Sequence, residues 1–182
     1  MHFETRMITL KDGRACELRP TTAEYAQEMI DYLRLTAAET PFLLRYPDEV
    51  TFTPENEREL LTGIYEDGQT AMMLGLVDGV LAGNCSLSPI GGMRRIRHRG
   101  SVAIAVKKAY WGLGLGTAML SYLEELARKA GYEQLELEVV DGNDSARGLY
   151  EKLGFSVTGR HVHAMKYDHG SFRDEWIMSK EI

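Results

Sequence analysis

Apolar and polar positions alternate in short runs at the start of the chain. Residues 7–10 and 15–19 both follow this pattern, and the turn-forming Lys11-Asp12-Gly13-Arg14 separates them. A period of two is the spacing of a β-strand, so the pattern predicts a hairpin.

Apolar residues then take helical spacing in two segments. Thr21 or Thr22 can cap the first helix, whose apolar stripe is Tyr25, Ala26, Met29, Leu33 and Ala37. The second helix opens with Thr53-Pro54-Glu55, the favoured order of cap, proline and acid, and runs to about Tyr65. Between them, residues 39–51 show no clean period and predict a loop rich in apolar side chains. Two interpretations stay open for this loop: it packs on the core, or it forms a wall of a substrate site.

Strand patterns return in the middle of the chain. Residues 70–77 and 80–88 flank Asp78-Gly79, the strongest short hairpin signal. A third strand enters through an arginine-rich segment, residues 94–99, and continues into the apolar run from Val102 to Val106. The sheet here is predicted to be antiparallel.

The second half alternates helices and strands. A helix with the stripe Leu115, Met119, Leu123 and Leu126 ends at Gly131, and its Glu124 and Glu125 each precede a basic residue by four positions. Leu135, Leu137 and Val139 alternate with glutamates in a strand. Residues 143–153 predict a short helix, and residues 155–165 and 172–178 predict a closing strand pair. The order is β-β-α-α-β-β-β-α-β-α-β-β, a mixed α/β sheet in one domain spanning residues 1–182.

The segment from Trp111 to Thr117 places glycine at every second position directly before a helix. Glycine lets the backbone approach a ligand closely, and the helix start directs free N–H groups and a positive dipole end into the loop, as at phosphate sites. No lysine follows Gly116, which excludes a P-loop. The spacing also fails the dinucleotide-binding pattern, because Thr117 or Met119 stands at its third glycine.

Val106, Trp111, Gly112, Gly114 and Gly116 resemble the pyrophosphate loop of the GNAT superfamily of N-acetyltransferases. Trp111 stands where that family usually has Arg or Gln, a departure that matters little if backbone N–H groups bind the phosphate. A second block, Asn143-Asp-Ser-Ala-Arg-Gly-Leu-Tyr-Glu-Lys-Leu-Gly-Phe155, is similar to the other signature of the same family.

This resemblance implies a GNAT-like acyl-CoA N-acyltransferase fold in which the strands ending at Val106 and Val139 begin side by side and splay apart. The resemblance further implies that the pantetheine arm of acetyl-CoA lies in that gap and that a backbone N–H near Val106 holds the thioester oxygen. The expected cofactor-binding residues are Ile104, Val106, Trp111, Gly112, Leu113, Gly114, Gly116, Thr117 and Asn143.

Tyr150 is the expected general acid for the departing thiolate, a role that its place in the second block implies. The alternative is an aromatic residue that packs on the sheet. Members of the family often have a glutamate on the strand before the glycine loop, but here the strand from Ser101 to Val106 holds no acid, so no general base stands out. His98, Glu39, Asp48 and Glu138 are the candidates, and a water chain is the alternative.

Composition narrows the partners. The 182 residues carry a net charge of −6, which argues against nucleic acid as the main partner. Cys16 and Cys85 are isolated, and His161 with His163 fits a solvent-facing strand, so no metal site is expected. No signal peptide or membrane span is visible, which predicts a cytoplasmic protein. The arginines of residues 94–99 are expected at a solvated turn, or alternatively on the cofactor's extra phosphate or an acidic substrate.

The sequence therefore predicts an acetyl-CoA-dependent N-acetyltransferase that acts on a small-molecule or peptide amine, either as a monomer or as a homodimer. A non-catalytic acyl-CoA-binding or sensing module is the alternative.

Overall fold

The computed structural model describes residues 1–182 and contains one eight-stranded sheet in the order β1-β2-β3-β4-β5-β6-β8-β7. Every neighbouring pair is antiparallel except β5 with β6. The predicted order of elements is confirmed. Their bounds are β1 Arg6–Thr9, β2 Ala15–Pro20, α1 Ala26–Glu39, α2 Pro54–Glu66, β3 Ala71–Val77, β4 Val80–Pro89, β5 Arg99–Val106, α3 Leu115–Lys129, β6 Gln134–Val140, α4 Asp144–Lys152, β7 Ser156–Lys166 and β8 Phe172–Glu181.

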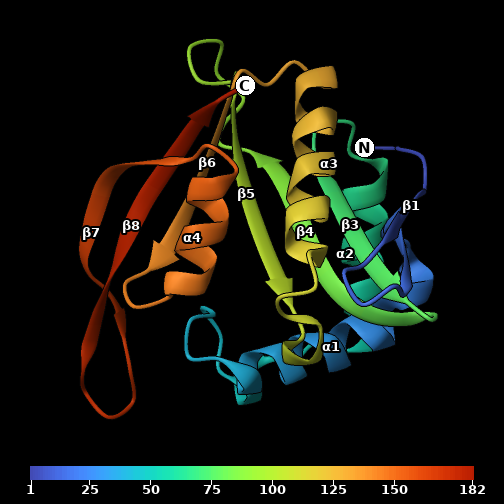
Figure 1. Ribbon diagram of the computed structural model, residues 1–182, viewed down its shortest axis with the longest axis horizontal. Coiled ribbons are helices and arrows are strands. Elements are labelled where there is room, and N and C mark those ends of the chain that lie inside the picture. The colour runs from blue at the N-terminus through green and yellow to red at the C-terminus, as the bar shows by residue number, and fades with distance from the viewer.

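Helices cover both faces of the sheet (Figure 1). Helices α3 and α4 lie on one face, above the larger core, in which the stripe Leu115, Met119, Leu123 and Leu126 is buried as predicted. On the other face, Met29 and Tyr32 of α1 pack with Leu74, Leu76 and Leu81. No helix is both long and apolar enough to cross a membrane.

Two details of the helices differ from the prediction. A short 3-10 turn, Ala23–Tyr25, precedes α1, so neither threonine caps it: the Thr22 hydroxyl donates to Glu24, and the Thr21 hydroxyl is buried without a partner. On α3, Glu124 pairs with Arg128 at 2.5 Å as expected. Glu125 instead pairs with Arg6 of β1 at 2.7 Å, because β1 lies alongside this turn of the helix.

Strands β5 and β6 are paired only at their beginnings. Their register runs from Arg99 opposite Gln134 to Ser101 opposite Glu136 and then stops, although both strands continue. Figure 1 shows them diverging as a V, with α4 between them in this view and α3 on the other side of β5, in front of β4. The predicted splay is confirmed.

Tyr32 of α1 makes hydrogen bonds along the edge of β5 that faces β4. Its hydroxyl accepts a hydrogen bond from the Asn84 N–H (3.0 Å) and donates one to the Ala105 carbonyl (2.7 Å). Asn84 and Ala105 are register partners on β4 and β5, so a side chain from α1 bridges the two strands within the sheet. Burial raises the pKa of this phenol, which therefore stays protonated.

We predict that Tyr32→Phe lowers the free energy of unfolding by about 1–3 kcal/mol, because both backbone groups lose a buried partner. Urea unfolding measures the change. Tyr122→Phe is the control, since that hydroxyl donates only to the Glu4 carbonyl at the chain's edge and its loss should cost less. Unchanged stability of Tyr32→Phe would mean that the two strands close directly and do not need the bridge.

Candidate active site

A cavity of about 1040 Å³ occupies the space where β5 and β6 diverge. Its wall contains all but one of the predicted site residues: Ile104, Val106, Trp111, Gly112, Gly114, Gly116, Thr117, Asn143 and Tyr150. Leu113 is the exception, because its side chain packs toward the core and its carbonyl accepts from the Lys11 N–H at 3.0 Å. The structure thus brings both sequence blocks to one cleft.

The glycine segment forms a nest of unpaired backbone N–H groups. Gly112 and Gly114 have φ of +75° and +91°, a left-handed conformation that favours glycine. The N–H groups of residues 112–117 donate to no acceptor in the protein, and the first intrahelical bond of α3 comes from Ala118. Such a nest at the start of a 15-residue helix attracts anions through both its donors and the helix dipole.

Trp111 departs from its predicted part in this nest. Its backbone N–H donates to the Lys108 carbonyl at 3.1 Å, so the nest begins one residue later than expected. Its indole N–H donates to the Val106 carbonyl at 2.6 Å. Trp111 therefore ties the glycine segment to the end of β5.

The end of β5 offers a donor to the cleft. Lys107 donates its N–H to Ala82 on β4. Successive N–H groups of a strand point to opposite sides, so that of Val106 points into the gap, where β6 is no longer paired.

Tyr150 lies on α4, on the opposite side of the gap. Asn143 caps this helix by accepting from the Ala146 N–H at 3.3 Å, so its oxygen is engaged within the protein. The Tyr150 ring packs edge-on to Phe155 and is only 7% exposed, yet its hydroxyl has no hydrogen-bond partner and is not sealed from solvent. Burial raises the pKa of Tyr150 to about 12. The residue is thus both a packing aromatic and a free donor at the cleft.

The model of the acetyltransferase (GNAT) family matches residues 23–155, which is more than half of the chain. The chain belongs to the GNAT family of acetyltransferases.

Individual relatives agree with this assignment. A *Bacillus subtilis* (strain 168) protein named uncharacterized N-acetyltransferase YobR is 34% identical over 44% of this chain, and streptothricin acetyltransferase of *Streptomyces lavendulae* is 29% identical over 70%. The chain spans 33% and 64% of their lengths. The crystal structure of a GNAT-family acetyltransferase from *Streptococcus pneumoniae* has a TM-score of 0.86 at 28% identity, covering 92% of this chain and 99% of that one.

A further solved structure carries the ligand expected of the family. That of yncA from *Salmonella typhimurium*, with its cofactor acetyl-CoA, has a TM-score of 0.79 at 19% identity, over 91% of this chain and 93% of that one. This likeness shows a shared fold.

The four candidate bases differ in their position relative to the cleft. Only Glu138 lines the cavity. The Glu39 carboxylate is engaged by the Lys108 N–H at 2.7 Å, Asp48 lies in an exposed turn, and His98 precedes β5 at the end far from the glycine segment.

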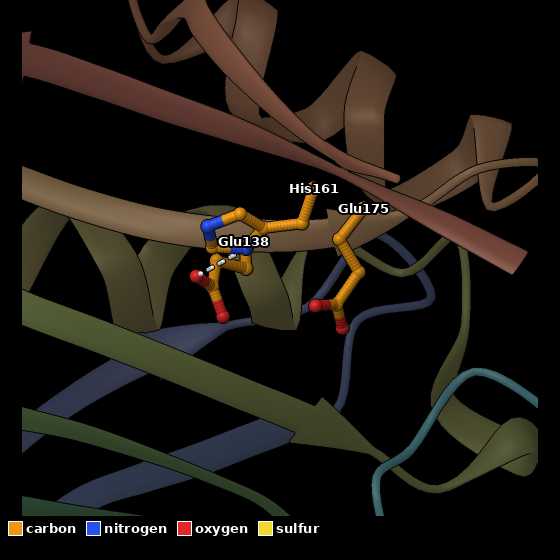
Figure 2. A group of neighbouring side chains, drawn as sticks. All are labelled: Glu138, His161 and Glu175. Atoms are coloured by element: carbon orange, nitrogen blue, oxygen red, sulfur yellow. Dashed lines mark ion pairs between the residues drawn. The ribbon is translucent and has the colours of Figure 1, made fainter. Parts of the chain in front are cut away.

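Glu138 belongs to a cluster of ionisable side chains with His161 and Glu175 (Figure 2). His161 is opposite Glu175 in the β7–β8 register, and Glu138 is opposite Ile177, two residues along the same face of β8. The His161 Nδ1 lies 3.3 Å from a Glu138 oxygen, and the ligand atoms of all three residues lie within 4.8 Å of one another. The cluster is the result of the strand order β6-β8-β7, which joins residues distant in sequence.

Glu175 also lines the cleft and is the acid that sequence reasoning missed. Burial raises the pKa of its carboxyl, the negative Glu138 raises it further, and His161 lowers it. The sequence places it only in the predicted closing strand, residues 172–178, and the pairing of that strand with β6 brings it to the cleft. His161, expected on a solvent-facing strand, is exposed but joins this cluster at the cleft's edge, and the expectation of no metal site stays a prediction.

The loop after α1 forms a wall of the cleft through Phe42, Leu43 and Leu44. The β7–β8 turn meets this loop: the Tyr167 hydroxyl donates to the Pro41 carbonyl at 2.8 Å, and the Asp168 N–H donates to the Tyr46 hydroxyl at 3.0 Å. Leu44 is 79% exposed, so the structure favours the substrate wall over the interpretation of a loop packed on the core.

The arginine-rich segment does not reach the cleft. Residues 94–98 form the turn before β5, and β5 separates them from the glycine segment. Arg99 pairs with Glu136 of β6 at the point where the two strands are still joined. The position fits a solvated turn and gives no support to a role on the cofactor.

Proposed function

We propose that this protein transfers the acetyl group of acetyl-CoA directly to a primary amine of a small molecule or peptide. The observation that carries the proposal is the cleft between β5 and β6, which has free amide donors at one end and the unpartnered Tyr150 hydroxyl beside it. When bound, acetyl-CoA supplies an activated thioester.

The glycine segment holds the pyrophosphate of the cofactor. Its support is the open nest of N–H groups from residues 112–117, which presents donors without side-chain obstruction at Gly112. Ile104 and Val106 line the neighbouring wall along the pantetheine arm, and the Val106 N–H stabilises the negative charge that develops on the acetyl oxygen.

Tyr150 donates its proton to the leaving sulfur. With a pKa of about 12, the Tyr150 phenol is a weaker acid than an ordinary tyrosine, whose pKa is near 10. Full proton transfer to a thiolate whose thiol has a pKa of ~8.5 would cost about 5 kcal/mol if the sulfur were in water. The same burial raises the pKa of the thiol and narrows this difference, and a hydrogen bond alone already stabilises the developing thiolate.

Glu138 and Glu175 act on the acceptor amine. An attacking amine must be neutral, and a carboxylate at the cleft can take its proton directly or through one water. The two carboxyl groups lie on the β6–β8 side, across the gap from β5, where the wall of Phe42 and Leu43 leaves room for an acceptor. A non-catalytic sensing module would need the glycine segment but neither Tyr150 nor these carboxylates.

We expect Gly112→Ala to weaken acetyl-CoA binding about tenfold, because alanine disfavours the left-handed conformation that aims the N–H groups. Gly131→Ala is the matched control: it also has a positive φ (+85°) and open space around it, but lies at the other end of α3. Calorimetric titration measures both. Equal acetyl-CoA affinities of the two variants would show that the nest is not part of the cofactor site.

Tyr150→Phe should lower kcat by about 10²- to 10⁴-fold and change acetyl-CoA affinity less than about twofold, because the proton matters mainly in the transition state. Thiol release over an amine panel gives kcat, and melting temperature checks that the packing against Phe155 survives. A fully active phenylalanine variant would exclude Tyr150 as the acid. No turnover by the wild type on any amine would favour the sensing module.

The pH dependence should report Glu175. If the ionised carboxylate takes the proton, kcat/KM rises with pH through the raised pKa of Glu175, so the acid limb lies above ~4.3, the ordinary value for glutamate. Glu175→Gln should lower kcat/KM about 100-fold and move this limb. Asp144→Asn, an acid in the same wall but on α4, should leave the limb in place. An unmoved limb in Glu175→Gln would assign the proton transfer elsewhere.

A further inference from the structure

The wall of the cleft contains a single cationic side chain. Its charged residues are Lys11, Glu136, Glu138, Asp144 and Glu175. Residues 111–117, the glycine segment itself, carry no charge. A phosphate ligand therefore enters a site whose side chains are mostly negative, and only Lys11 can offset that repulsion.

Lys11 belongs to the turn between β1 and β2, far in sequence from the glycine segment. Its N–H donates to the Leu113 carbonyl at 3.0 Å, and its side-chain carbons lie 3.8 Å from where a Cβ on Gly114 would stand. Arg14, from the same turn, lies over the Tyr110 ring at 5.1 Å. The turn is thus docked on the glycine segment and on Tyr110, the residue directly before it.

The charge of Lys11 is not used within the protein. Lys11 makes no ion pair, and the neighbouring Asp12 is paired with Arg14 at 2.7 Å. The two basic residues closest in sequence to the glycine segment point elsewhere: Lys107 lies over the Tyr32 ring, and the exposed Lys108 is not part of the cleft wall. Lys11 is therefore a free cation beside an anion-binding nest.

We propose that the Lys11 ammonium group binds the pyrophosphate of the cofactor that rests on the N–H groups of residues 112–117. The inference depends on the proposed function, because it concerns the same cofactor. It assigns to the first turn of the chain a contact that the glycine segment cannot make, since an amide nest supplies hydrogen bonds but no full positive charge.

Calorimetric titration of the full chain with coenzyme A tests the proposal. Lys11→Met keeps most of the aliphatic stem and removes the charge, and it should weaken binding about 3- to 10-fold at low salt. The loss should shrink as salt is raised, since ions screen a partly exposed contact. Lys108→Met is the matched control, because it removes a nearby charge outside the cleft wall and should change affinity less than about twofold.

Coenzyme A without its 3′-phosphate locates the contact. The same loss with this analogue supports the pyrophosphate, whereas a loss confined to intact coenzyme A would overturn that assignment. Equal losses of affinity in Lys11→Met and Lys108→Met would mean that any nearby positive charge has the same effect, which would also overturn the proposed contact. Failure of the proposed function is distinguishable, because it shows as absent turnover by the wild type on the amine panel, whereas the Lys11 contact stands or falls by the calorimetric comparison.

Discussion

The early end of the β5–β6 ladder is the constraint on which the site depends. Two parallel strands that stop pairing after Ser101 and Glu136 leave backbone donors and acceptors facing each other across a gap. Buried backbone groups need partners, so this gap is stable only with water or a ligand in it. The fold holds β5 away from β6: Tyr32 binds the Ala105 carbonyl from one side and Trp111 binds the Val106 carbonyl.

Charge is distributed unevenly along the resulting cleft. The glycine segment offers amide donors, a helix dipole and the adjacent Lys11, all of which favour an anion. Glu138 and Glu175 lie on the β6–β8 side with His161, where they favour a cation or a proton. In the proposed function, the long anionic cofactor and the amine acceptor would therefore occupy different parts of one cavity.

Local patterns predicted the elements well because each element is encoded within a short window. Three examples are as predicted: the buried stripe of α3, the Asp78-Gly79 turn with φ of +52° and +77°, and the cap at Thr53. Glu175 and Lys11 reach the cleft only through strand order and turn docking, which no local window contains. The predicted threonine cap of α1 was wrong, because a 3-10 turn separates the threonines from the start of the helix.

The proposed function requires the cofactor to lie in the gap between β5 and β6 with its phosphates on the glycine segment. Backbone amide resonances of isotope-labelled protein, followed during addition of acetyl-CoA, test it most directly. The account predicts that the amides of Val106 and residues 112–117 shift most, while those of the arginine-rich turn at residues 94–98 stay in place. Shifts at that turn with a silent glycine segment would contradict it.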